Sequence, residues 1–251
     1  MTGIEMKDLR LQYGARVIAD QLQVTLDKPE IVSIIGPNGS GKSTLLKAMA
    51  RLLLPSAGTV YLHGRDMNSF SADALARIIS FLPQSAQAPG DMTVRDLVLM
   101  GRLPYQGLFS SLSEDDIRAA DKALEETEMT ELRHHRLSEL SGGERQRAWL
   151  SLALAKEPEI LLLDEPTTYL DIHHQLDLME LIAHLYETTH MMVVMVLHDL
   201  NLALSCAHRV AVLEEGQLRR VGAPEEIYAS GVLEKVFQVR AHSVETAKGE
   251  R

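Results

Sequence analysis

An eight-residue segment, GPNGSGKS at positions 36–43, constrains the fold of this chain more than any other part of the sequence. It follows an apolar run at 30–35 that is rich in β-branched residues, and it precedes a helical pattern at 42–51. The glycines let the loop curl so that its backbone N–H groups converge on an anion, and the start of the helix adds unpaired donors and partial positive charge. The sequence therefore predicts a phosphate-binding loop between a buried strand and a helix.

This loop predicts a site for a nucleoside triphosphate and magnesium. Lys42 supplies a mobile positive charge for the β- and γ-phosphates, and the hydroxyl of Ser43 is suited to ligate Mg²⁺. The residues predicted to contact the nucleotide are Gly36, Pro37, Asn38, Gly39, Ser40, Gly41, Lys42, Ser43 and Thr44.

A pair of acids follows a second buried-strand run at 160–163. The carboxyl ends of parallel strands face the crevice in which α/β folds bind ligands. We expect Asp164 to hold Mg²⁺ through its hydration shell, and Glu165 to orient or deprotonate an attacking water molecule. Adjacent acids are usually solvated surface, so this interpretation depends on the buried strand and on the phosphate-binding loop.

Short apolar runs alternate with longer helical patterns, which indicates an α/β fold with parallel strands and helical crossovers. The runs at 30–35, 160–163 and 191–197 are largely apolar without polar alternation, as expected of strands covered on both faces. The N-terminal residues instead predict a smaller antiparallel sheet beside the parallel one. Its strands are expected at 9–13, 17–26 and 59–62.

The pattern from residue 93 to about 156 is helical almost throughout. We therefore expect a single domain in which 89–156 is an inserted helical subdomain, while 1–88 and 157–240 form the nucleotide-binding lobe. An antiparallel segment is expected at 210–221. The polar stretch 241–251 is expected to be a frayed tail.

Local signals inside the helical insert predict where its helices begin and which faces they expose. Thr93 and Ser113 are predicted N-caps, the latter followed by acids that the helix dipole favours. The acidic pairs are expected to be solvated helix faces: Asp115 with Asp116, and Glu125 with Glu126.

Charge and cysteine content exclude several classes of protein. There are 25 Lys and Arg against 35 Asp and Glu, a formal charge of −10, so we expect no nucleic-acid partner. The single Cys206 cannot form an internal disulfide and suits a reducing cytosol. The apolar run at 191–197 is too short to span a bilayer, and charged residues interrupt the N-terminus where a signal peptide needs an apolar core.

A second helix start resembles an anion site. The motif LSGGE at 140–144 precedes a long helical pattern that runs to about 156. Ser141 is a predicted N-cap with open backbone donors beyond it. One nucleotide has no obvious need for two such helix starts from one chain, so we expect the second to serve a nucleotide held by another copy.

Together these motifs resemble those of the ATP-binding subunit of ABC transporters over nearly the whole chain. They fall in the family's order: the phosphate loop, Gln84, LSGGE at 140–144, the acids at 164–165, YLD at 169–171 and His198. The resemblance implies a P-loop NTPase core with a parallel sheet, an N-terminal antiparallel β subdomain and an inserted helical subdomain. It also implies a head-to-tail dimer that encloses ATP and Mg²⁺.

The resemblance further implies roles for particular residues. Tyr13 would stack on adenine, Gln84 would sense Mg²⁺ and the attacking water, and His198 would contact the γ-phosphate. The segment Ser141, Gly142, Gly143 and Glu144 of one subunit would cover ATP on the other, and Asp171 would connect the two sites. Tyr169 departs from the small residue that many relatives carry.

Each of these assignments has a simpler alternative. Tyr13 is also compatible with a half-buried strand aromatic, Gln84 with a solvated loop amide, and His198 with a helix-start histidine. The histidine pairs at 134–135 and 173–174 are expected on the surface or at an interface, because neighbours on a helix converge poorly on one ion.

The segments at 93–105 and 164–175 look like those of the ATPases of iron-chelate, haem and vitamin B12 importers. The resemblance implies an ATP hydrolase that powers uptake of an iron chelate through a separate permease, and among iron chelates it favours a ferric siderophore. A periplasmic or surface substrate-binding protein would be an indirect partner. We then expect a peripheral subunit on the cytoplasmic side of the inner membrane. The alternatives are haem, vitamin B12 or another metal as cargo, or a soluble ABC ATPase such as that of iron–sulfur-cluster assembly.

Overall fold

The three largely apolar runs form the centre of the molecule. In the computed structural model, which describes residues 3–107 and 111–242, they become β3 (Ile31–Ile35), β7 (Ile160–Asp164) and β8 (Met192–Val196). Every residue of these strands is buried, and the strands are parallel neighbours in the order β3-β8-β7. The prediction of parallel strands covered on both faces is confirmed.

Three further strands complete this six-stranded sheet, whose order is β10-β9-β3-β8-β7-β6. They are β6 (Ile79–Leu82), β9 (Arg209–Glu214) and β10 (Gln217–Gly222). Strand β6 runs parallel to β7 and β9 parallel to β3, whereas β10 is antiparallel to β9. The antiparallel segment expected at 210–221 is therefore the hairpin at one edge of the sheet.

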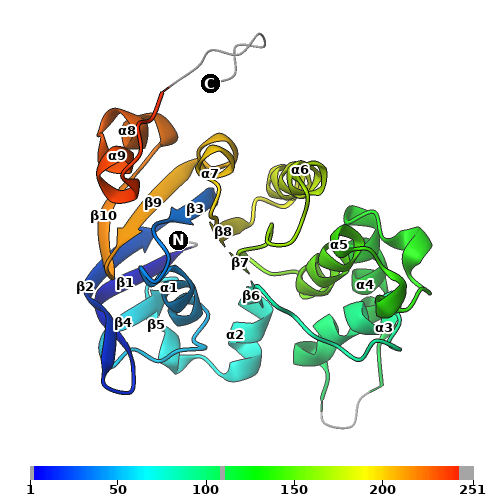
Figure 1. Cartoon of the computed structure of the whole chain (residues 1–251). Helices are drawn as coiled ribbons and strands as arrows, with labels where there is room; N and C mark the ends of the chain where they lie inside the picture. The colour runs from blue at the N-terminus through cyan, green and yellow to red at the C-terminus, as the bar shows by residue number, and fades with distance from the viewer. Residues whose placement is uncertain (1–2, 108–110, 243–251) are drawn as a thin grey trace.

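The N-terminal residues form a separate antiparallel sheet, as predicted, with the order β2-β1-β4-β5. Its strands are β1 (Ile4–Tyr13), β2 (Arg16–Leu26), β4 (Ala57–Leu62) and β5 (Arg65–Asp66). Helix α1 (Lys42–Met49) lies between this sheet and the six-stranded one (Figure 1).

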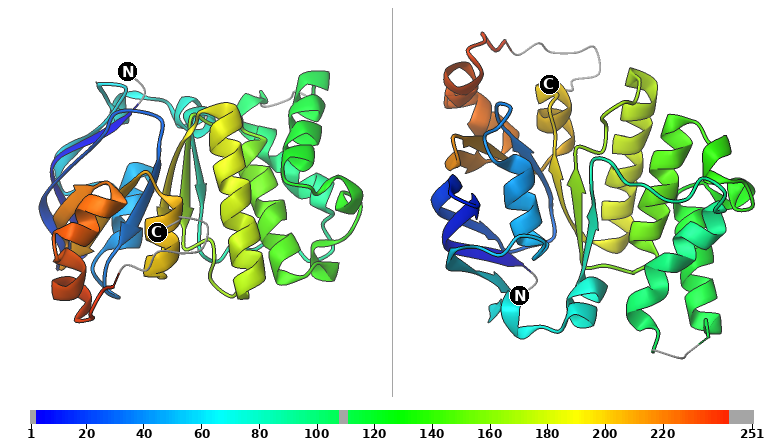
Figure 2. Two further views of the ribbon diagram at one scale, coloured as in Figure 1. Left: turned by 90° about the horizontal axis from the view of Figure 1, so that it is seen from above. Right: turned by 60° about the horizontal axis from the view of Figure 1, so that its bottom comes forward.

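Because side chains alternate along a strand, the buried strands of the central sheet contribute side chains to two hydrophobic cores, one on each face. Val32 and Ile34 of β3 pack with Leu45 of α1 and with the antiparallel sheet. Ile31 and Ile35 face the opposite core, which contains apolar side chains from the helices between β6 and β7 and from the long helix after β7. The result is a layered molecule in which α1 and the helical segment after β6 lie on opposite faces of the sheet (Figure 2).

The helices beyond α1 are mostly short. They are α2 (Ala72–Ile78), α3 (Val94–Leu99), α4 (Glu114–Glu126), α5 (Gly142–Leu154), α6 (Ile172–Thr189), α7 (Leu200–Cys206), α8 (Pro224–Ala229) and α9 (Val232–Phe237). The 3₁₀ turns are η1 (Met67–Ser69), η2 (Met100–Tyr105), η3 (Thr130–Leu132) and η4 (Leu137–Glu139). Within the described ranges, none of these helices combines the length and apolar character needed to cross a membrane.

The connection from β6 to β7 carries α3, α4 and α5 with three 3₁₀ turns. The predicted N-caps Thr93 and Ser113 are confirmed, and each forms a capping box with the acid three residues later. Residues 243–251 of the expected frayed tail lie outside the described residues.

Two helices end earlier than predicted. Helix α1 stops at Met49 because Arg51 adopts a left-handed conformation (φ 55°) and its guanidinium donates to the carbonyl oxygens of Met67 and Phe70. Helix α5 stops at Leu154, and Glu157 is likewise left-handed (φ 51°). A left-handed residue cannot continue a right-handed helix.

The prediction that Asp116 is a solvated acid is wrong. Its carboxylate is buried, accepts hydrogen bonds from Ser113 and lies 3.0 Å from Nε of Arg102, which is also buried. The hydrogen bonds from Ser113 hold the pKa of this carboxyl below its ordinary value, and the charge of Arg102 adds to that effect. The neighbouring Asp115 does lie on the exposed face of α4.

Candidate functional site

The order of the central strands brings distant motifs together at the carboxyl edge of the sheet. The phosphate loop follows β3, His198 lies two residues beyond β8, Glu165 directly follows β7, and Gln84 lies two residues beyond β6. These strands are consecutive in the sheet, in the order β3-β8-β7-β6. Since parallel strands end at the same edge, the loops after them form one site.

The phosphate loop is closely packed against β9. A Cβ on Gly36 would lie 2.0 Å from the carbonyl oxygen of Leu213, and Gly41 caps α1 in a left-handed conformation (φ 102°). Both positions therefore require glycine. The ammonium of Lys42 donates to the carbonyl oxygens of Gly36 (2.8 Å) and Pro37 (3.0 Å), so this side chain curls over its own loop.

Ser43 and Asp164 connect the loop to β7. The Ser43 hydroxyl donates to Oδ1 of Asp164 at 2.7 Å. Burial raises the pKa of Asp164, and the hydrogen bond from Ser43 opposes that change. Burial likewise lowers the pKa of Lys42, against the attraction of Glu165 and Asp164. The negative charge of Asp164 and the positive charge of Lys42 are thus held in poorly hydrated surroundings, where they interact more strongly than at the surface.

Glu165 is held from both sides. Gln84 Nε2 donates to Oε2 at 2.5 Å, His198 Nε2 lies 2.5 Å from Oε1, and the Thr168 hydroxyl donates to Oε2 at 3.2 Å. The side chain of Glu165 is 14% exposed, so one narrow side still faces solvent. The structure therefore fixes the carboxylate that sequence reasoning selected, and it brings Gln84 and His198 to it.

Thr168 was missed from the sequence, because a threonine three residues after an acid carries no signal of its own. Its position follows from a turn that only the structure shows: Thr168 N–H donates to the Glu165 carbonyl, and Glu165 itself is left-handed (φ 52°). That geometry returns the Thr168 hydroxyl to the Glu165 side chain.

Tyr13 lies at the end of β1, and its side chain is 48% exposed. It pairs with Arg16 across the turn to β2. A Cβ built on Gly41 of the phosphate loop would lie 3.0 Å from Cγ2 of Ile18 in β2, so this strand and the loop are adjacent. The β1–β2 hairpin therefore lies beside the phosphate loop, with an exposed aromatic ring near its tip.

The segment that begins at Ser141 forms the first turn of α5, on the other face of the sheet from α1. Ser141 is the predicted N-cap and forms a capping box with Glu144. Hydrogen bonds from the Ser141 backbone and hydroxyl lower the pKa of Glu144. Ser141 and Gly142 are exposed, so this helix start is open to solvent.

Asp171 is the N-cap of α6 and accepts a hydrogen bond from the backbone N–H of His174. The loop before it exposes Tyr169 almost completely (88%) in a left-handed conformation (φ 69°). Gln175 Nε2 donates to the carbonyl oxygens of Thr167 and Leu170, which closes this loop.

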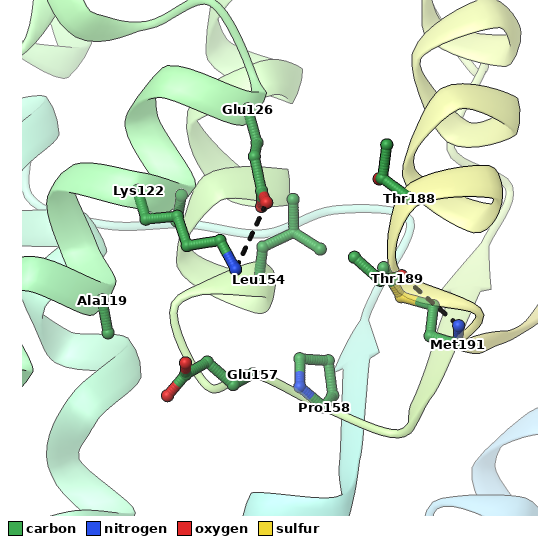
Figure 3. Close-up of a pocket in the computed structure, with 10 residues that line it drawn as sticks. Ala119, Lys122, Glu126, Leu154, Glu157, Pro158, Thr188, Thr189 and Met191 are labelled. Carbon is green, nitrogen blue, oxygen red and sulfur yellow. Dashed lines mark hydrogen bonds and ion pairs between the residues drawn. The ribbon is translucent and has the colours of Figure 1, made fainter.

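Two cavities lie outside the carboxylate cluster. One, of about 480 Å³, borders the phosphate loop at Asn38 and Gly39 and reaches Phe237 of α9. The other, of about 300 Å³, lies between α4, the end of α5 and the end of α6, and is lined on its α4 side by the Lys122–Glu126 ion pair (Figure 3). Its walls include Pro158, which precedes β7, so it lies at the opposite edge of the sheet from the nucleotide motifs.

Comparison with known families supplies the deciding observation: the family model described as ABC transporter matches residues 19–168, more than half of the chain. The chain belongs to the ABC transporter family. The iron(3+)-hydroxamate import ATP-binding protein FhuC of Bacillus subtilis (strain 168) is 41% identical over 244 residues, which cover 97% of this chain and 91% of FhuC.

Solved structures agree with this membership. A chain of a metal-chelate type ABC transporter in an inward-facing conformation superposes with a TM-score of 0.86 at 28% identity, over 99% of this chain and 94% of that one. The ATP-binding cassette MJ0796, a dimer in a post-hydrolysis state with ADP and phosphate, gives 0.75 at 29% identity, over 88% and 98%. Cassettes of this ABC type therefore bind nucleotide and form dimers.

Proposed function

We propose that this chain is the ATP-hydrolysing subunit of an ABC importer. The observation that carries the proposal is the Glu165 carboxylate, held at 2.5 Å by both Gln84 and His198 beside the hydrogen bond from Ser43 to the buried Asp164. A carboxylate fixed in this way can orient a water molecule and accept its proton. The phosphate loop next to it supplies the triphosphate to be attacked.

Catalysis here is largely positioning together with stabilisation of charge. The loop N–H groups and the start of α1 bind phosphate oxygens, and Lys42 leaves the carbonyl oxygens of Gly36 and Pro37 to reach them. Gln84 and His198 keep the Glu165 carboxylate in place while it holds water. Tyr13 supplies a ring for the adenine.

The residues present suit magnesium. Ser43 and Asp164 offer oxygen ligands 2.7 Å apart, and Gln84 offers an amide oxygen. Within the part of the chain that the structure describes, no Lys or Arg forms an ion pair with the buried Asp164. Hard oxygen donors of this kind are those that Mg²⁺ selects. When bound, Mg²⁺ neutralises charge on the phosphates.

The working unit is a head-to-tail dimer. Since α1 and α5 lie on opposite faces of the sheet, one chain cannot apply both helix starts to the same triphosphate. A second copy supplies Ser141, Gly142, Gly143 and Glu144 to the nucleotide on the first phosphate loop, and Asp171 joins the two sites. The insert 89–156 moves as a helical subdomain against the lobe 1–88 and 157–240.

The cargo is an iron chelate, with a ferric siderophore favoured. The likeness to the iron(3+)-hydroxamate import protein FhuC, over nearly the full length of both chains, supports this choice. A separate permease would carry the chelate, a periplasmic or surface binding protein would deliver it, and this subunit would lie peripherally on the cytoplasmic face of the membrane.

ATP binding and hydrolysis by the purified chain, measured with Lys42→Ala and with Lys122→Ala as control, test the enzymatic part. We expect Lys42→Ala to weaken ATP binding by about tenfold or more, because a desolvated charge pair is lost, and Lys122→Ala to leave it unchanged. Unchanged ATP affinity in Lys42→Ala would contradict the site.

Uptake tests the cargo. Cells carrying Glu165→Gln in place of the wild-type chain should lose accumulation of a radio-iron-loaded hydroxamate chelate. Normal chelate uptake with loss of haem or vitamin B12 uptake would transfer the assignment to that cargo. No transport defect at all, and no polytopic protein co-purifying from detergent-solubilised membranes, would favour a soluble ABC ATPase.

A further inference from the structure

His174 makes two contacts that no nucleotide motif explains. Its Nδ1 lies 2.7 Å from Oδ1 of Asp171, the oxygen that also accepts its backbone N–H at 2.9 Å. The ring orientation is thereby fixed by the N-cap of its own helix, α6. The adjacent His173 differs: its side chain is 81% exposed, and it pairs with Asp177 at 3.5 Å.

The other contact is with Gly143, in the first turn of α5. A Cβ built on Gly143 would lie 2.5 Å from Cδ2 of His174, 3.1 Å from Cγ and 3.3 Å from Nε2. All three nearest atoms belong to the imidazole, so the ring occupies the space that a side chain at position 143 would need. A contact of 2.5 Å is far below any normal carbon separation.

The neighbouring glycine provides a comparison. A Cβ on Gly142 would meet only Cδ2 of Leu170, at an ordinary 3.9 Å. A side chain at 143 would therefore displace either the His174 ring or the start of α5, whereas the chain's own packing leaves room for a methyl group at 142.

We propose that His174 is a positioning residue that sets the first turn of α5 against the Asp171 loop. Gly143 packs against the His174 ring, and the Asp171 carboxylate orients that ring. The Asp171 loop begins at Glu165, the carboxylate that acts on the nucleotide bound by the same chain. His174 therefore links that carboxylate with the segment 141–144, which covers the nucleotide bound by the partner. The catalytic consequence rests on the proposed function, but the packing role does not.

Removing the ring should act on turnover more than on nucleotide binding. In His174→Ala we expect kcat to fall about tenfold with KM for Mg-ATP within about twofold, because displacement of a catalytic segment by an ångström is costly while the phosphate loop is untouched. His173→Ala is the matched control and should behave as wild type. A kcat for His174→Ala equal to that of wild type would overturn the proposal.

Gly143→Ala and His174→Ala should be strongly non-additive. With the ring present the new methyl group has no room, so Gly143→Ala alone should lower kcat more than about tenfold; with the ring removed it should add no further loss. Equal losses in both backgrounds would mean that Gly143 is constrained by something other than His174.

Hydrogen exchange makes the test independent of hydrolysis. In the nucleotide-free chain, His174→Ala should speed amide exchange at 141–145, with no change at 42–49 and none in His173→Ala. Unchanged exchange at 141–145 would refute the positioning role even if wild type proved inactive. An inactive wild type that shows the exchange difference would refute the proposed function alone.

Discussion

The imidazole Nε2 of His198 lies 2.5 Å from Oε1 of Glu165. The two residues follow neighbouring parallel strands, β8 and β7, and Gln84 beyond β6 reaches the other carboxylate oxygen. The carboxylate is thus oriented by the fold itself. An enzyme gains most when such groups are in place before the substrate arrives.

Glu165→Gln keeps the shape of this side chain and removes its charge. We expect ATP hydrolysis to fall by about 10²–10⁴-fold, since a general base contributes on that scale, while nucleotide affinity is kept and an ATP-bound dimer accumulates. Phosphate release and light scattering measure these effects, with the exposed Glu187→Gln as control. Hydrolysis at the wild-type rate would show that Glu165 is not the base.

Asp164→Asn should stabilise the nucleotide-free chain at neutral pH. Burial raises the folded-state pKa of Asp164 above its ordinary 3.8, so the folded state binds this proton more tightly than the unfolded state does. Stability therefore falls as pH rises from about 3.8 through the folded pKa, and at neutral pH the ionised group is a net cost. Thermal melting should show a higher Tm for Asp164→Asn at pH 7 and a smaller difference near pH 4. A lower Tm at pH 7 would contradict the assignment.

Arg102→Met should destabilise the helical insert. Arg102 is buried, donates to Asp116, Glu157 and the carbonyl of Ala155, and stacks 3.8 Å from the Tyr105 ring centroid. Removing one partner of a buried pair costs about 3–5 kcal/mol.

Denaturant unfolding measures this loss, with Arg118→Met as control. Arg118 pairs with Asp115 on the exposed face of α4, so its loss should change the free energy of unfolding by less than about 1 kcal/mol. Similar losses in the two variants would show that burial of the Arg102 pair is unimportant.

Gly36→Ala should damage the phosphate loop. The new Cβ would lie 2.0 Å from the Leu213 carbonyl oxygen, a backbone atom of β9 that cannot rotate away. We expect the free energy of unfolding to fall by about 1–3 kcal/mol and nucleotide binding to weaken. Gly90→Ala, whose Cβ would meet Ser138 at an ordinary 3.5 Å, is the control and should melt like wild type.

Elements with a local cause are predictable from the amino-acid order alone. Continuous apolar runs specified β3, β7 and β8, and the spacing of glycines before Lys42 specified a phosphate loop. Capping residues such as Ser113 and Ser141 specified where helices begin, because a cap bonds only to the next turn. These signals also placed Asp164 and Glu165 at the end of a strand.

Which distant side chains meet depends instead on how the helices and strands pack. The order β3-β8-β7-β6 brings His198 and Gln84 to Glu165, and no local pattern encodes that order. Asp116 is buried because Arg102 lies opposite it, and His174 faces Gly143 because α5 and α6 pack together in the same core. Contacts between residues far apart in the chain depend on how whole elements pack, so composition and spacing could name the candidates but not their partners.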